Sequence, residues 1–176
     1  LPGYKLLYQL PHSVFSLLKD KSVLEPNIAT ARQGLCTFDD FRFVRLRWEV
    51  VPSQIGVNNT WEVLAKGGEH AQYYSDLYLL VKWDTDGREL AEVNLLVNGQ
   101  TAQARQASEY YRRAGATYSK RSAKGFSARA LPANCIIATK GPAVLSESEI
   151  DAAYLVGWLN SSLIRGLIHI QANFSE

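Results

Sequence analysis

The sequence predicts a mixed α/β (α+β) domain in which a twisted, mostly antiparallel sheet has flanking helices and a helical C-terminal segment. Three observations support this fold class. Short apolar runs bounded by glycine, proline and aspartate predict strands. From Ser146 onward, apolar residues recur at helical spacing. With 47% hydrophobic residues among 176, the chain can bury one substantial core. We therefore expect residues 1–176 to form a single domain.

The N-terminal part predicts short elements. Lys5–Leu10 is expected to be extended and Ser13–Asp20 to be helical, with Pro11 between them. The following loop, within Ala29–Phe38, contains small residues, and Gly34 would allow a tight reversal or the close approach of a ligand.

An aspartate pair precedes the next predicted element. Asp39 or Asp40 can cap a short helical turn that contains Phe43. A strand is expected to follow from Leu46 to Val51, where Pro52 ends it.

The middle of the chain predicts two strands and then an ambiguous segment. The strands are Trp61–Lys66 and Leu77–Trp83, and the second ends in the turn signal DTDG. Within Arg88–Ala107 the run ELAEVNLLV could be a helix, and Asn98 with Gly99 marks a turn.

Further strands are expected after a short helix over Ala102–Arg113, which Gly115 would close. Thr117–Arg121 and Phe126–Leu131 should flank the tight SAKG link, with Cys135–Thr139 as a third strand.

The stretch that starts at Ser146 combines a serine cap, early acidic residues and apolar helical spacing. One or two helices are expected there, with Gly166 as a weak point. Aromatic residues among apolar neighbours are assigned to the core, namely Phe43, Trp48, Trp83 and Trp158.

Positive charge is concentrated between Ala104 and Leu131. Seven basic residues and one acidic residue, Glu109, give this stretch a charge of +6 (7 − 1), whereas the whole chain sums to +2. Interleaved tyrosines and Phe126 suit a polyanion with flat bases. The alternative is a solvated helix face followed by an ordinary hairpin. The basic residues are Arg105, Arg112, Arg113, Lys120, Arg121, Lys124 and Arg129.

Several function classes lack their sequence signals. Neither an apolar run of about 18 residues nor a leader signal occurs, so no membrane association and a cytoplasmic location are expected. The histidines show no metal-ligand spacing, and neither GxSxG nor a P-loop is present. Cys36 and Cys135 are expected to be buried thiols, with a disulfide as the alternative. The start at Leu1 and the absence of methionine suggest a piece of a longer protein.

Four stretches, in order, resemble motifs of a known family. RQGLCTFDDFRFVRLRWEV resembles G-x-x-T-G-D-N-x-R-F-x-R-x-W-W-E-V, and KGGEHAQYYSDLYLLVKWDTDG resembles K-G-G followed by W-Y-G and V-x-W-x-x-D-G. ATYSKRSAKGFSARALPANCIIATKGPAV is similar to T-W-S, F-S-x-R-x-x-P and G-P in series, and YLVGWLNS to Y-L-L-G-L-L-N-S. They resemble the target-recognition region of adenine-N6 DNA methyltransferases of the restriction-linked and BREX phage-defence (PglX-like) type. The resemblance spans about Arg32–Ile168.

This resemblance implies a division of labour within a longer enzyme. In the family, an upstream domain binds S-adenosylmethionine and handles the flipped adenine through an Asn-Pro-Pro-Tyr type motif. The present sequence contains neither that motif nor a glycine-rich cofactor loop. We therefore expect it to bind duplex DNA next to the methyltransferase domain, without a cofactor of its own and without catalysis.

The sequence departs from the family pattern at several positions. Phe38 and Asp40 stand where the motif has glycine and asparagine, which tolerate a positive φ better. Tyr73 and Tyr118 replace tryptophans and keep the aromatic ring. The residues expected to contact DNA are Arg32, Lys66, Gly67, Gly68, Tyr118, Lys120, Arg121, Lys124 and Arg129, because arginine can read guanine and lysine anchors phosphate.

Two other functions remain open from the sequence. The chain could be a protein-interaction module. Tyr154 and Trp158 would then contact a catalytic domain or a defence-complex partner. Asp39, Asp40 and Glu49 could serve a hydrolase or nuclease only if they converge around a metal ion.

Overall fold

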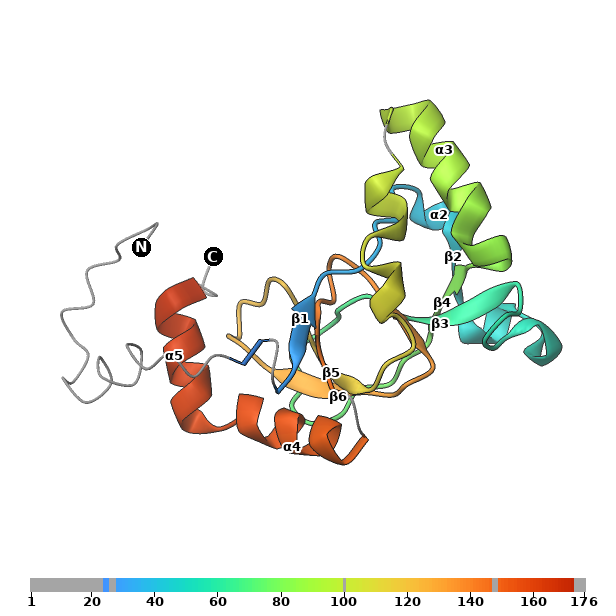
Figure 1. The fold of residues 1–176 in the computed structure, drawn as a ribbon. Helices are drawn as coiled ribbons and strands as arrows, with labels where there is room; N and C mark the ends of the chain where they lie inside the picture. Colours follow the sequence, from blue (N-terminus) through green and yellow to red (C-terminus); the bar gives the residue numbers. More distant parts are fainter. Residues whose placement is uncertain (1–23, 26–27, 100, 147–148, 173–176) are drawn as a thin grey trace.

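The computed structural model describes residues 24–25, 28–99, 101–146 and 149–172, and these form an α+β fold (Figure 1). The fold class is as predicted, but the strands divide between two four-stranded sheets instead of one. The predicted extended segment Lys5–Leu10 and helix Ser13–Asp20 lie outside the described residues.

The first sheet is entirely antiparallel, and its strand order is β1-β8-β5-β6. Its strands are β1 (Thr30–Arg32), β5 (Gly115–Tyr118), β6 (Ala128–Leu131) and β8 (Ala143–Leu145). β5 pairs with β6 as the sequence predicts, through Thr117 opposite Arg129. The sheet therefore carries the basic SAKG link at one end of the β5–β6 pair.

The second sheet has the order β2-β4-β3-β7. Its strands are β2 (Val44–Leu46), β3 (Trp61–Ala65), β4 (Leu79–Lys82) and β7 (Cys135–Ile137). β3 and β4 confirm two predicted strands, while β7 pairs with β3 in parallel and so leaves the sheet that contains β5 and β6. The chain between β6 and β7 thus joins the two sheets.

Helices lie at both ends of the molecule (Figure 1). The helices are α2 (Asp40–Phe43), α3 (Arg88–Asn98), α4 (Glu149–Leu159) and α5 (Ser162–Ala172). Single 3₁₀ turns occur at Arg47–Glu49, Pro52–Gln54, Asp84–Gly87, Ala102–Arg105 and Ser108–Tyr110. Figure 1 shows α2 and α3 near one end and α4 and α5 at the other.

Two apolar clusters stabilise this arrangement. The larger one gathers residues of the second sheet with Phe43, Trp83 and Leu90, each at most 2% exposed. The smaller one forms where α4 packs on β5 and β6, and it buries Leu155 and Val156. Burying an aliphatic side chain of this size contributes about 1.5–3 kcal/mol, so α4 is held by its apolar contacts.

Asp39, one of the two predicted candidates, caps α2, but the strand expected after it is wrong. Asp39 Oδ1 accepts a hydrogen bond from the Arg42 backbone N–H at 3.1 Å. β2 then covers Val44–Leu46, and a 3₁₀ turn at Arg47–Glu49 occupies half of the predicted strand Leu46–Val51. The Glu49 carboxylate accepts from the Leu46 N–H at 2.7 Å, and this bond closes the chain into a turn.

The predicted helix Ala102–Arg113 is replaced by two short 3₁₀ turns. Ala107 has φ +56° and Arg112 has φ +61°, and a left-handed residue interrupts a right-handed helix. The Tyr111 hydroxyl donates to the carbonyl of Gln106 at 2.8 Å while its ring packs edge-on against Trp83. Tertiary contacts of the aromatic and basic side chains thus override the local helical pattern.

The C-terminal segment forms two helices, as allowed by the sequence, but the break lies at Asn160–Ser161 and not at Gly166. Asn160 is 5% exposed, and its amide accepts from the Ala128 N–H at 3.1 Å and donates to the Ala128 carbonyl at 2.7 Å. The side chain therefore pairs with the β6 backbone as a neighbouring strand would. This contact explains why α4 ends there.

The core assignment of the aromatic residues is half correct. Phe43 and Trp83 are buried, whereas Trp48 is 73% exposed and Trp158 is 37% exposed. Trp48 follows β2 in the 3₁₀ turn and stacks on Tyr78 at a centroid distance of 6.1 Å. Its exposure results from the early end of β2, which turns this ring out of the sheet.

Candidate nucleic-acid interface

The first half of the basic stretch is neutralised within the protein. Arg112 makes a two-pronged contact with the buried carboxylate of Glu62, at 2.9 and 2.7 Å. Arg105 pairs with Asp86. The Arg113 guanidinium lies 5.2 Å from the ring centroid of Tyr110. The solvated helix face considered for this half is therefore wrong, because these cations serve internal contacts.

The second half presents its cations to solvent. Lys120, Arg121 and Lys124 are exposed, and none forms an ion pair with any residue in the part of the chain described here. The turn between them is tight, since Gly125 has φ +84° and its N–H donates to the Ser122 carbonyl at 3.2 Å. Uncompensated cations on a compact link are suited to phosphate contacts.

Three loops that are far apart in sequence meet beside this link. The Lys120 N–H donates to the Lys140 carbonyl at 3.1 Å, and the Ser119 hydroxyl donates to the Gly68 carbonyl at 2.7 Å. Gly67 has φ +92°, and a Cβ there would lie 2.6 Å from the Lys140 carbonyl oxygen. The predicted Gly67 and Gly68 therefore permit the close packing of these loops, and nothing larger than glycine fits at Gly67.

Arg129 is buried at the centre of this junction, with 2% exposure. Its guanidinium donates to the Glu69 carbonyl at 3.0 Å and to the Ser119 hydroxyl at 3.1 Å. No carboxylate among the described residues pairs with it, and burial lowers the pKa of this guanidinium. Arg129 was predicted to contact DNA, but its side chain is buried and connects the Glu69 loop to the loop that contains Ser119.

Lys66 lies at the edge of the same junction and is mostly buried. Its ammonium group pairs with the Asp40 carboxylate, which also accepts a hydrogen bond from the Thr37 hydroxyl. Burial opposes ionisation of Asp40, but these hydrogen bonds and the charges of Lys66 and Lys140 lower its pKa. The Lys66 charge is thus partly compensated.

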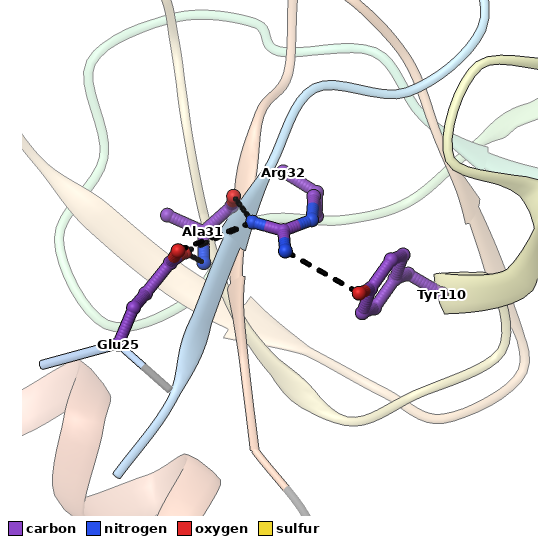
Figure 2. Close-up of polar contacts among 4 residues, drawn as sticks. All are labelled: Glu25, Ala31, Arg32 and Tyr110. Atoms are coloured by element: carbon purple, nitrogen blue, oxygen red, sulfur yellow. Dashed lines mark hydrogen bonds and ion pairs between the residues drawn. The ribbon is translucent and has the colours of Figure 1, made fainter. Parts of the chain in front are cut away.

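Arg32 lies on β1 (Figure 2), where it pairs with Ala143 of β8. Its guanidinium lies between Glu25 and Tyr110, 3.1 Å from the Glu25 carboxylate and 3.3 Å from the Tyr110 hydroxyl. The hydrogen bond to Tyr110 and the pair with Glu25 raise the pKa of Arg32, although burial opposes this shift. Arg32 thus joins β1 to Glu25 and Tyr110, and its contact with DNA stays a prediction.

Tyr118 ends β5, directly before the basic link. Its ring is half-buried and packs against Phe126 at a centroid distance of 5.3 Å. Burial raises the pKa of the Tyr118 hydroxyl, so this group stays protonated at neutral pH. The pair supports the base of the link.

Lys140 was not among the predicted site residues. It is exposed, lies in the turn Ala138–Gly141, and forms no ion pair with the described residues. The signal that could have identified it is its place in the ATKGP end of the third family-like stretch. The structure brings this stretch together with KGG at Lys66–Gly68.

The residues proposed for a hydrolase do not share one ion site. Asp39 caps α2, Asp40 pairs with Lys66, and Glu49 bonds to the Leu46 N–H. Within the described ranges, no three or more histidines, cysteines or carboxylates cluster in a way that could hold a metal ion. Cys135 is a buried free thiol as predicted, whereas Cys36 is only half-buried, and its assignment to the core is wrong.

No helix within the described residues is long and apolar enough to cross a membrane.

No family model matches the sequence. The chain is, however, similar to a segment of a curated methyltransferase. That relative is the adenine-specific methyltransferase PglX of Lacticaseibacillus casei (strain Zhang), with 24% identity over 171 residues. The match covers 92% of this chain but 14% of the relative, so the chain is similar to a small part of that relative's length.

Proposed function

We propose that this chain is the DNA target-recognition domain of an adenine-specific DNA methyltransferase. The observation that carries the proposal is the junction of three loops that present Lys120, Arg121, Lys124 and Lys140 without ion-pair partners among the described residues. Similarity to part of PglX supplies the enzymatic context. The domain would hold duplex DNA while a methyltransferase domain elsewhere in the same protein carries S-adenosylmethionine and the chemistry.

We infer the setting from the resemblance of the four sequence stretches to restriction-linked and BREX type enzymes. A restriction-modification or BREX type phage-defence enzyme would act on DNA in the cytoplasm, and the recognition domain alone would be inactive. Phosphate contacts by the four free cations would supply non-specific affinity. Sequence reading requires base contacts from the same loops.

A mobility-shift titration of the 176-residue chain against a duplex, at several salt concentrations, tests this function. Four phosphate contacts predict a slope of about −3.6 for log K against log salt, since each contact contributes about −0.9. Failure to bind duplex DNA at low salt, or an affinity that does not depend on salt, would contradict the proposal.

A second function is supported by the outer face of α4. Tyr154 is 73% exposed and Trp158 is 37% exposed, although α4 buries its other face on the first sheet. Exposed aromatic residues of this size are typical of protein interfaces. This face would dock on the methyltransferase domain, and a Tyr154→Ala substitution in the full-length enzyme should then loosen the domains without changing DNA affinity of the isolated chain.

A further inference from the structure

A pocket of about 410 Å³ lies beside the loop junction, between the segment that precedes α2 and the Thr139–Lys140 turn. Its lining includes the two exposed phenylalanines Phe38 and Phe41, together with Asp40, Lys66 and Lys140. The volume falls within the range of small-ligand sites. Lys66 and Lys140 also border the proposed DNA-binding loops, so the pocket and the junction are continuous.

The Phe41 side chain extends almost fully into solvent at the mouth of this pocket. It is 95% exposed, although Phe43, two residues later, is 1% exposed and anchors α2 in the core. A phenylalanine this exposed gains nothing from the hydrophobic effect within the chain. Its ring is therefore available to stack on a flat partner.

The adjacent Phe38 has an unusual backbone conformation. Its φ is +56°, which is uncommon for a residue other than glycine, asparagine or aspartate, and its side chain is 49% exposed. Strained residues of this kind persist where the surrounding structure holds them, and they cluster at ligand sites. Phe38 keeps the positive φ at the position where the family-like motif has glycine.

The loop that carries Phe38 and leads into α2, which carries Phe41, is fixed on both sides. The Leu35 N–H donates to the Ile137 carbonyl at 3.0 Å, and the Thr139 N–H donates to the Leu35 carbonyl at 2.8 Å. After the loop, Asp39 caps α2. A ligand would thus meet a site that is already formed, and the cost of ordering would be small.

The floor of the pocket carries a carboxylate that is positioned by its neighbours. Asp40 accepts from the Thr37 hydroxyl with one oxygen and pairs with Lys66 through the other. A carboxylate oxygen can accept a further hydrogen bond, and exocyclic amino groups are its natural donors on a base. Cytosine, adenine and guanine carry such a group, whereas thymine does not.

We propose that this pocket accepts one unstacked nucleotide of a bound duplex, with Phe41 stacked on the base, Asp40 accepting from its amino group and Lys140 near its phosphate. The proposal rests on the DNA-binding function above and identifies an unstacked nucleotide as the ligand of the pocket. It also predicts a preference, since an exocyclic amino group can donate to Asp40 in addition to Thr37 and Lys66, whereas thymine has no amino group and offers only its ring N3–H.

The test uses duplexes that contain one central bulged nucleotide, either cytosine or thymine, and the same duplex fully paired. Fluorescence anisotropy with the 176-residue chain should show the bulged-cytosine duplex bound about tenfold more tightly than the paired one, as expected for stacking on one ring. Bulged thymine should bind more weakly than bulged cytosine.

The discriminating variant is Phe41→Ala, which removes an exposed ring and so leaves the core unchanged. It should lose the preference for the bulged duplex and keep its affinity for the paired duplex. Leu96→Ala, at an 85% exposed apolar position on α3, is the matched control and should keep the preference. If Phe41→Ala retains the preference, or the wild-type chain has none, the pocket proposal is wrong while DNA binding stands. If the wild-type chain binds no duplex, both proposals fail.

Discussion

The buried guanidinium of Arg129 donates to the main-chain carbonyl of Glu69 at 3.0 Å. With its second bond, to the Ser119 hydroxyl at 3.1 Å, this side chain joins a loop of the second sheet to the link between β5 and β6. A buried arginine without a carboxylate partner contributes little net stability, because desolvation of the charge offsets its hydrogen bonds. The role of Arg129 is therefore to hold the Glu69 loop against the link between β5 and β6.

Replacing Arg129 should therefore separate stability from DNA binding. We expect Arg129→Met to change the free energy of unfolding by less than about 1.5 kcal/mol, because an apolar side chain of similar volume removes the buried charge. DNA affinity should fall about tenfold, since the lost bonds release the loops. Urea unfolding and DNA titration measure the two effects. An unchanged affinity would show that Arg129 does not position the loops.

The free cations should contribute to DNA affinity through phosphate contacts. Lys120→Gln with Arg121→Gln is expected to reduce the salt slope by about 1.8, since each phosphate contact contributes about 0.9. Arg88→Gln, which removes an exposed cation on α3, is the control and should leave the slope unchanged. Equal slopes for the double variant and the wild-type chain would remove these residues from the interface.

The pair of Glu62 and Arg112 should be important for stability, not for DNA binding. Glu62 is 1% exposed, and Arg112→Ala would leave its carboxylate buried without its partner. Arg112 is itself one-third exposed, so we expect a loss of about 2–3 kcal/mol, below the range for a fully buried pair. Chemical denaturation measures the loss. A double variant with Glu62→Gln should recover part of it, and full additivity would contradict the coupling.

The Asn160 contact with β6 should be worth about 2–3 kcal/mol. Asn160→Ala leaves the buried N–H of Ala128 without its side-chain partner and removes one of two donors to the Ala128 carbonyl, which keeps the Tyr73 N–H at 2.9 Å. Thermal unfolding of the variant measures the effect. Ser162→Ala, at an exposed position in the first turn of α5, is the control and is expected to change stability by less than about 0.5 kcal/mol.

The Cys135 thiol should make stability depend on alkaline pH. Burial raises the pKa of Cys135 to about 12, whereas an unfolded cysteine ionises near 8.5. The unfolded state therefore loses its proton first, so stability is complete below about pH 8.5 and falls as the pH rises toward 12. At pH 10 the loss should be about 2 kcal/mol relative to pH 7.

Cys135→Ala removes this contribution and Cys36→Ala is the control. Urea unfolding at pH 7 and at pH 10 should show a smaller pH-dependent loss of unfolding free energy for Cys135→Ala than for the wild-type chain and Cys36→Ala. A loss of the same size in all three would exclude Cys135 as its source.

The sequence predicted the elements whose local pattern agrees with their tertiary contacts. β3, β4 and an aspartate cap on α2 were predicted because strand composition, turn residues and capping chemistry are local signals, whereas α3 was only one reading of an ambiguous segment. The Ala102–Arg113 helix failed because the Arg112 side chain pairs with Glu62, fifty positions earlier, and its backbone takes a positive φ. A partner so distant leaves no local pattern.

The exposed cations of the candidate site could be identified only in part, and their contacts with DNA stay predictions. Charge density identified Lys120, Arg121 and Lys124, whose exposure needs no partner. It could not distinguish them from Arg129, because burial of Arg129 depends on the pairing of β5 with β6 and on the position of Glu69. Lys140 was missed because a lone lysine in a turn carries no density signal, and its place beside Lys120 arises only when β8 pairs with β5.

The place of β8 in the first sheet also determines when the fold can be completed. β8 lies between β1 and β5, so Thr30 pairs with Leu145 and Gly115 pairs with the same residue from the other side. On the ribosome, β1 must wait for more than a hundred further residues before its neighbour emerges, and contacts this distant in sequence form slowly. A nascent chain that stops before Ala143 would leave both flanking edges open to other strands. Chaperone dependence during synthesis is the expected consequence.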